Sequence, residues 1–177
     1  MRIRLLTPLL MILLIFAPYT LAQAQTQKDE RSVKAAYIYN FLHFTEWPTP
    51  PNQPFHFCIV GHTSLDRELA RLNHKPIRDG VVIAISHVSV TDDWGFCRAL
   101  FVDSSSRKQI DRLLVKLNSA PILTISDSKG LADHGIMIEM GARHNRIAFD
   151  INLKAAHAAN MNFSARLLKL ARYVAMR

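Results

Sequence analysis

The chain has 177 residues, of which 49% are apolar and 20% are charged, and 22 Lys and Arg against 14 Asp and Glu give a formal charge of +8. This length suits one domain, and the apolar fraction is large enough for a buried core, which excludes an intrinsically disordered chain. Only 6 Gly and 8 Pro are present, which excludes a collagen-like or low-complexity protein. The basic excess on its own would make nucleic acid or an anionic surface a candidate partner.

The first 24 residues have the pattern of a secretory signal peptide. Arg2 and Arg4 precede an apolar run, and the small residues Ala22 and Ala24 suit cleavage after Ala24. The apolar run is shorter than the roughly 20 residues that a transmembrane helix needs, although an uncleaved anchor is the alternative. We therefore predict one domain over residues 25–177, located in the periplasm. Loss of the two arginines leaves a charge of +6, and export separates the protein from nucleic acid.

Periodic patterns predict alternating helices and strands after this segment. Apolar residues from Val33 to Phe44 recur at spacings of three and four, which predicts a helix over Glu30–Phe44, and the prolines from Pro48 onward forbid its continuation. Short apolar runs predict strands, with helical patterns between several of them. The remaining predicted strands are Phe55–Gly61, Val81–Val90, Arg98–Asp103, Pro121–Ser126, Gly135–Met140 and Arg146–Ile151, and the remaining predicted helices are Leu65–Leu72 with Ser64 as N-cap, Ser106–Leu117, Leu153–Ala159 and Ser164–Val174.

This alternation predicts an α/β protein of three layers, with a mainly parallel sheet and helices on both of its faces. Parallel neighbours need crossover connections, and the helical segments between the strands supply them. The runs FCIV, VVIAI, ALFV and ILTI are continuously apolar, which is typical of strands that are covered on both faces. The last two predicted strands are separated by only five residues, so we expect an antiparallel hairpin at one edge of the sheet.

Polar residues follow three predicted strands, at Gly61–Ser64, Asp103–Ser106 and Ser126–Ser128. Loops at the carboxyl edge of an open α/β sheet often bind ligands, so a periplasmic small-ligand receptor is one candidate function. The same residue types are also common helix N-caps, which is the simpler interpretation. The chain has no G-x-S-x-G turn and no zinc-binding histidine spacing, so we predict no catalytic residue, metal or cofactor, and no enzyme activity.

Cys58 and Cys97 are the two cysteines of the chain. In an exported protein a pair of cysteines is more often bridged than free. Cys58 lies within one predicted strand and Cys97 directly precedes another, so a disulfide would hold these strands side by side if they are neighbours. Two separate buried thiols are the alternative at this point.

Two sets of residues are candidates for binding a partner. The first is a basic set in the predicted last helix, which would contact an acidic protein or, weakly, an anionic membrane surface, although a solvated helix face is the alternative. The second belongs to an aromatic cluster that exceeds what one buried stripe needs, although core packing accounts for part of it. The candidate residues are Arg166, Lys169 and Arg172 in the first set and Tyr39, Phe44 and Trp47 in the second.

Several blocks of the chain resemble the YfiR-like family of periplasmic proteins over Ser32 to Ala171. The matching blocks are VKAAYIYNFLHFTEWP, FCIVG, the segment from Cys97 to Val102, PILTISD, GIMIEM, RIAFDINL and SARLLKLA. The resemblance implies a three-layer α/β protein that forms a homodimer. It also implies that the protein represses an inner-membrane diguanylate cyclase of the YfiN type by binding its periplasmic domain, which would keep cyclic-di-GMP synthesis low.

The resemblance also bears on the cysteines. Cys58 and Cys97 fall where a better-known repressor of the family has one of its disulfides, which supports their pairing. That relative has a second, closely spaced cysteine pair in the region that corresponds to Ala132–Glu139, where this chain has none. Redox control through a second bridge is therefore not carried over to this protein.

Overall fold

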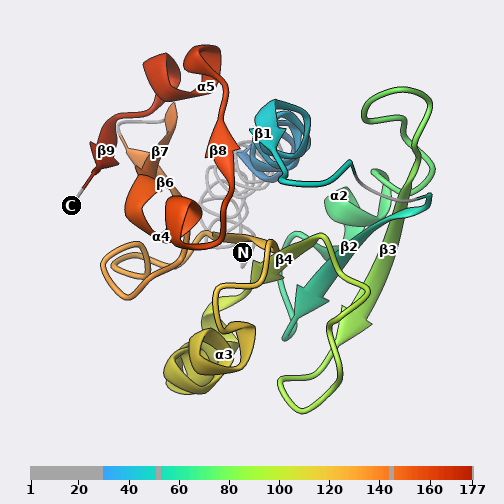
Figure 1. The fold of residues 1–177 in the computed structure, drawn as a ribbon, viewed down its shortest axis with the longest axis horizontal. Coiled ribbons are helices and arrows are strands. Elements are labelled where there is room, and N and C mark those ends of the chain that lie inside the picture. The colour runs from blue at the N-terminus through green and yellow to red at the C-terminus, as the bar shows by residue number, and fades with distance from the viewer. Residues whose placement is uncertain (1–29, 51–52, 144–145, 177) are drawn as a thin grey trace, which may run out of the picture.

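The computed structural model describes residues 30–50, 53–143 and 146–176, so the predicted signal peptide lies outside the described residues. The fold is mixed α/β and is built around a seven-stranded sheet with the strand order β3-β2-β4-β5-β6-β7-β9 (Figure 1). The first five strands of this order run parallel to their neighbours, β6 and β7 pair antiparallel, and β9 lies parallel to β7. The mainly parallel sheet predicted from the sequence is confirmed.

The elements follow the predicted alternation closely. A helix over residues 30–44 leads into β1, which pairs with β8 in a separate two-stranded antiparallel sheet. In chain order the remaining bounds are β1 Thr45–Glu46, β2 Phe55–Val60, α2 Asp66–Ala70, β3 Ile83–Val88, β4 Ala99–Val102, the 3-10 helix η1 Ser104–Gln109, α3 Ile110–Leu117, β5 Leu123–Ser126, β6 Ile138–Arg143, β7 Arg146–Asn152, α4 Leu153–Ala158, β8 Asn162–Phe163, α5 Ala165–Leu170 and β9 Tyr173–Ala175.

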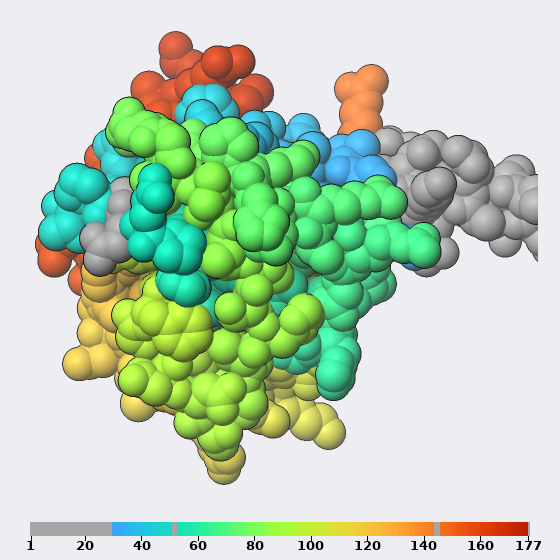
Figure 2. Space-filling view, turned by 90° about the vertical axis from the view of Figure 1, so that its right-hand side faces the viewer, coloured from blue at the N-terminus to red at the C-terminus, as the bar shows by residue number. Residues whose placement is uncertain are grey.

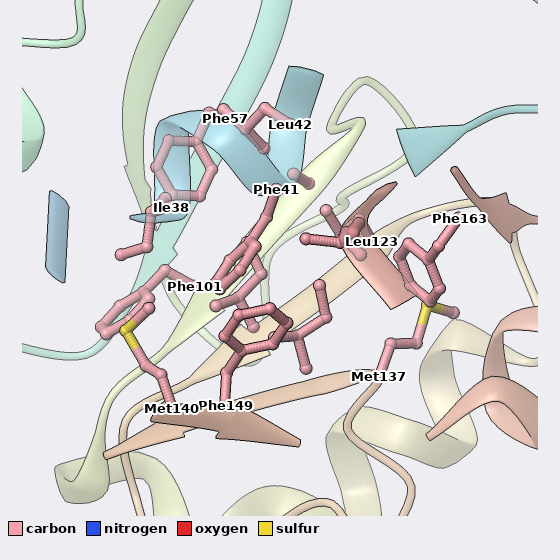
Figure 3. Packing of buried hydrophobic residues seen from close by; sticks show 14 of the residues in the cluster. Ile38, Phe41, Leu42, Phe57, Phe101, Leu123, Met137, Met140, Phe149 and Phe163 are labelled. Atoms are coloured by element: carbon pink, nitrogen blue, oxygen red, sulfur yellow. The ribbon is translucent and has the colours of Figure 1, made fainter. Parts of the chain in front are cut away.

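The larger hydrophobic core lies on the sheet face that the helix of residues 30–44 covers. Alternate residues of the strands point to this face, since side chains along a strand alternate between the two faces. Phe41 of the helix, Phe101 of β4 and Phe149 of β7 are buried together there (Figure 3). The Phe41 and Phe149 rings pack edge to face with 4.8 Å between their centroids, which joins the helix to β7.

A second hydrophobic core lies on the opposite face, under α3 (Figure 1). Leu113 of α3 packs there with Leu100 and Val102 of β4, which alternate with the residues that face the first core. Cys58 and Cys97 are buried in this cluster and form a disulfide. The bond joins β2 to the residue two positions before β4, and β2 and β4 are neighbours in the sheet. Two layers of side chains therefore sandwich the centre of the sheet.

Four local predictions were wrong. The predicted helix Ser164–Val174 ends at Leu170, and the chain turns at Ala171 into the short strand β9. As a result the hairpin of β6 and β7 is bordered by β9 and does not form the edge of the sheet. Ser64 does not cap α2, because the helix starts one residue later than predicted, with Leu65 at the N-cap and no side-chain cap hydrogen bond. Val33, predicted in the buried stripe, is 44% exposed.

Gly61 directly follows β2 and adopts a backbone conformation that favours glycine. Its φ of +93° lies in a region that side chains disfavour, and an added Cβ would be 2.6 Å from the Ser105 hydroxyl oxygen and 2.8 Å from that of Ser106. We expect Gly61→Ala to lower the free energy of unfolding by about 1–3 kcal/mol, from backbone strain and this close approach. Urea unfolding measures the loss. Gly141→Ala is the matched control, because a Cβ there meets nothing within 4 Å, and a loss as large in the control would contradict this explanation.

Candidate functional site

A hollow with a volume of about 1100 Å³ lies against one face of β6, β7 and β9. These three strands form one end of the sheet, opposite the end formed by β3 (Figure 1). The loop between β5 and β6 and the helix α4 form its sides. Nine small residues, all glycine or alanine, form much of its lining: Gly130, Ala132, Gly135, Gly141, Ala142, Ala148, Ala155, Ala158 and Ala175.

The hollow exists because the second face of the sheet is not covered here. Ile138 and Met140 of β6 point into the first core, so Glu139 and Gly141 point to the opposite face. Gly141 is paired with Ala148 of β7, and a Cβ at Gly141 would have no neighbour within 4 Å. The second hydrophobic core under α3 contains no residue of β6 or β7. The floor of the hollow is therefore an uncovered part of the sheet.

Charged groups on this floor are held by specific partners. Glu139 and Asp150 are directly paired across β6 and β7, which would be repulsive for two isolated carboxylates. Arg172 offsets this repulsion: its Nε donates to Asp150 Oδ1 at 2.8 Å, and its second contact joins Nη2 to Oδ2 of the same carboxylate. The hydrogen bonds and charge of Asp150, with a smaller contribution from Glu139, raise the pKa of Arg172 above its ordinary value. Arg172 thus remains positively charged in the hollow.

Two side chains fix the loop that borders the floor. Glu139 accepts a hydrogen bond from the Ala132 amide at 2.9 Å, and Asn152 Nδ2 donates to the Ala132 carbonyl at 2.8 Å. Asn152 also caps α4, because its Oδ1 accepts a hydrogen bond from the Ala155 amide. Glu139 and Asn152 therefore join the loop, the sheet and α4. These hydrogen bonds fix the shape of the hollow before a partner binds.

The charged residues that line the hollow suit a partner whose surface carries both positive and negative charges. Four acidic and four basic residues line it together with His134: Asp127, Asp133, Glu139, Asp150, Lys129, Arg143, Lys154 and Arg172. Its outer rim is apolar, because Tyr173 is 64% exposed and the nearby Met176 is 73% exposed. Tyr and Met side chains are enriched in protein interfaces relative to the rest of the surface. Among the residues that the structure describes, no group of three or more His, Cys, Asp or Glu is placed to hold a metal ion.

The basic set predicted from the last helix is divided between two places. Arg166 and Lys169 lie on α5, where the Arg166 guanidinium carbon is 5.4 Å from the centroid of the Phe44 ring. Arg172 lies beyond the C-terminal end of the helix. It lines the hollow and forms an ion pair with Asp150. The expected single basic stripe is therefore wrong, because the chain leaves the helix at Ala171 to form β9.

The aromatic candidates also lie apart. Tyr39 is half-buried, and its hydroxyl donates to the Pro76 carbonyl at 2.5 Å. Trp47 packs edge to face on Phe55 with 5.3 Å between ring centroids, and its Nε1 donates to the Arg98 carbonyl at 3.3 Å. Phe44 is half-buried and packs against the first core. The structure thus brings Phe44 and Arg166 together but gathers the six candidate residues into no common site.

Internal hydrogen bonds use the polar groups of the carboxyl-edge loops. Asp103 caps η1 by accepting from the Ser105 amide at 2.8 Å, and the Ser126 hydroxyl donates to the Val102 carbonyl at 2.7 Å. Lys34 bridges Asp127 at 3.2 Å and Glu30 at 3.1 Å, which ties the first helix to the third loop. Burial lowers the pKa of Lys34, but the two carboxylates outweigh this effect and raise that pKa above its usual value. These contacts favour the capping interpretation over a ligand site.

A sequence signal for the hollow was present in the strands of the predicted hairpin. Ile138, Glu139, Met140 and Gly141 alternate between apolar and other residues, and Phe149 to Asn152 alternate in the same way. Alternation is typical of a strand with one buried and one open face, unlike the continuous apolar runs of the central strands. The sequence did not reveal the place of Arg172 in the hollow, because that place depends on the formation of the strand β9.

The fold and this hollow define a class of protein: an α/β domain with an open, charged surface on the last strands of its sheet. A family model described as YfiR/HmsC-like matches residues 31–172, and the chain belongs to that family. It is a family of periplasmic regulators of diguanylate cyclase signalling, and its members are regulators and not enzymes. Within the described residues, no helix is both long and apolar enough to span a membrane.

Comparison with solved structures supports the fold. A conserved domain protein from Vibrio cholerae O1 biovar El Tor strain N16961 is similar with a TM-score of 0.55 and 10% sequence identity. The similarity covers 81% of the present chain and 60% of that protein, so the chain spans less than two thirds of its length. At this identity the likeness concerns the fold alone. No match was found among curated proteins.

Proposed function

We propose that this protein binds the periplasmic domain of an inner-membrane diguanylate cyclase of the YfiN type and holds its cyclic-di-GMP synthesis low. The observation that carries this proposal is the family match over residues 31–172, which spans nearly all of the described chain. Export by a signal peptide of residues 1–24 and a single domain over residues 25–177 are part of the same proposal. The cyclase would then meet the protein on the periplasmic side of the membrane.

The hollow on β6, β7 and β9 is the proposed contact surface for the cyclase. It is large, it is shaped by hydrogen bonds within the protein, and it carries fixed charges of both signs beside the exposed ring of Tyr173. Preformed surfaces of this kind bind with little loss of conformational entropy. Of the six candidate residues, Arg172 belongs to this surface. Phe44, Arg166 and Lys169 are proposed as a second contact region near α5, and Tyr39 and Trp47 are proposed only as peripheral contacts.

The decisive experiment fills the hollow without disturbing the fold. Gly141→Trp places a large side chain over the floor, where even a Cβ has no neighbour within 4 Å, and a strand readily accepts an aromatic residue. In cells that lack the gene, we expect cyclic-di-GMP to rise. The wild-type gene should restore the low level, and the Gly141→Trp gene should leave cyclic-di-GMP at the level of the deletion. Extracted cyclic-di-GMP is measured by mass spectrometry.

Val115→Trp is the matched control for this variant. Val115 is 79% exposed on α3 and is not among the residues that line the hollow, so the control adds the same side chain to a different surface. We expect it to restore the low level fully. A deletion that leaves cyclic-di-GMP unchanged would contradict the regulatory function itself, whereas full restoration by Gly141→Trp would contradict only the place of the contact.

The homodimer and a weak contact with the anionic membrane surface are further parts of the proposal. The exposed bases of α5, Arg166 and Lys169, are the groups on the described surface that we propose for the membrane contact. Sedimentation of the purified protein tests the dimer, and its salt-dependent binding to anionic vesicles tests the contact.

A further inference from the structure

A second, smaller cleft lies between the helix of residues 30–44 and α2, with a volume of about 190 Å³. In the space-filling view the blue atoms of that helix border green atoms of the chain after β2 (Figure 2). The helix side of the cleft is formed mainly by small residues, which leaves room between the two elements. The lining residues are Ser32, Ala35, Ala36 and Tyr39 on this side and Glu68, Arg71, Leu72 and Lys75 on the other.

Glu68 gives the inner part of the cleft a buried negative group. It is 5% exposed, and its Oε2 has no hydrogen-bond partner within the part of the chain that the structure describes. No ion pair of Glu68 occurs there either, although Arg71 lies one helical turn further on. A buried carboxylate without a partner is costly, so a group that donates hydrogen bonds and carries positive charge would bind it favourably.

The outer part of the cleft has the opposite charge. Arg71 and Lys75 are both exposed and have no ion pair among the described residues. Lys75 Nζ lies 5.6 Å from the centroid of the Tyr39 ring, which places this ammonium group beside the aromatic wall. The hydrogen bond from the Tyr39 hydroxyl to the Pro76 carbonyl holds the ring in place. A ligand that fits the cleft therefore needs a cation at its inner end and an anion at its outer end.

We propose that this cleft binds a phosphoethanolamine group, with its ammonium on Glu68 and its phosphate on Arg71 and Lys75. The two ends of this group carry charges opposite to those of the cleft, and its few heavy atoms suit a site of this volume. The inference does not depend on the proposed regulation of a cyclase. The same chemistry occurs in free phosphoethanolamine and in the headgroup of phosphatidylethanolamine lipids, and the experiment distinguishes these two sources.

Calorimetric titration of the purified protein with free phosphoethanolamine is the first test. We expect saturable binding, and we expect ethanolamine alone and glycerol phosphate alone to bind at least tenfold more weakly. Glu68→Gln keeps the shape of the side chain and removes its charge, so it should weaken binding at least tenfold. The double variant R71A/K75A should do the same through loss of the phosphate contacts. Lys108→Ala, which removes an exposed base of η1 that does not line the cleft, should leave binding unchanged.

Co-sedimentation with vesicles identifies the source of the group. Phosphatidylethanolamine mixed with phosphatidylcholine is compared with phosphatidylcholine alone, because both lipids are uncharged overall and only the first has an N–H donor. Binding to the mixed vesicles that Glu68→Gln abolishes identifies the lipid headgroup, and binding of the free compound alone identifies a soluble ligand. Absence of binding in both assays, or binding by Glu68→Gln and R71A/K75A that is as strong as that of the wild type, would overturn the proposal.

Discussion

Replacing Cys58 and Cys97 together by alanine is expected to lower the free energy of unfolding by about 4 kcal/mol. The disulfide closes a loop between residues 39 positions apart in sequence, and in the chain-entropy model a cross-link of this span restricts the unfolded chain by about that amount. Both cysteines lie in the second hydrophobic core, so loss of their sulfur atoms also leaves a small packing defect there. Urea unfolding of the oxidised wild type and of the double variant measures the difference.

The slope of the urea transition tests the cause of this loss. A cross-linked unfolded chain is more compact, so the variant should show a larger m-value than the oxidised wild type. Wild-type protein that is unfolded in the presence of a reductant should behave like the variant. Denatured, unreduced wild-type protein should contain no thiol that reacts with a labelling reagent. Two reactive thiols, or equal stability of the variant and wild type, would contradict the role given to this bond.

Phe41→Ala is expected to destabilise the protein by about 3–5 kcal/mol, a typical cost for removing a fully buried aromatic side chain. Phe41 is 0% exposed, and its ring packs on Phe149 of β7 and lies 6.1 Å from the Tyr37 ring. The change therefore opens a cavity where the first helix is joined to the sheet. Thermal and urea unfolding, with the native fold checked by circular dichroism, measure the loss.

Val33→Ala on the same helix is the matched control. Val33 belongs to the same predicted apolar stripe but is 44% exposed, so its truncation should change stability by less than about 0.5 kcal/mol. Phe41→Leu, which keeps most of the buried volume, should fall between the two. Similar losses for Phe41→Ala and Val33→Ala would show that the helix is not held to the sheet through Phe41.

Prediction from the sequence was most successful at the centre of the sheet. The strands β2, β4 and β5 are buried on both faces, so their composition is dominated by apolar residues and their positions are evident. The first helix was also predicted with its observed end at Phe44, because its buried face recurs with helical spacing and prolines follow it. In both cases a local pattern is sufficient to predict the element, because its buried positions recur at regular intervals along the sequence.

Prediction was least successful at the end of the chain. The segment after Leu170 continues a helical pattern in sequence, yet Tyr173 and Val174 belong to the strand β9, which Arg172 directly precedes. The Arg172 amide donates to the Phe149 carbonyl and its side chain binds Asp150, so pairing with β7 outweighs helix propensity here. The partner of this segment lies more than 20 residues earlier, and no local pattern contains that information.

The sequence by itself determined that this is an α/β protein with a mainly parallel sheet, and its blocks of residues were sufficient to indicate its family. These features follow from hydrophobic periodicity and composition, which act within each segment. Only the tertiary structure decided that Arg172 lies opposite Asp150, that Gly141 forms the floor of an open hollow, and that Glu68 is buried in a separate cleft. Each of these depends on which distant segments are brought into contact, because charge pairing and burial are properties of neighbours in space.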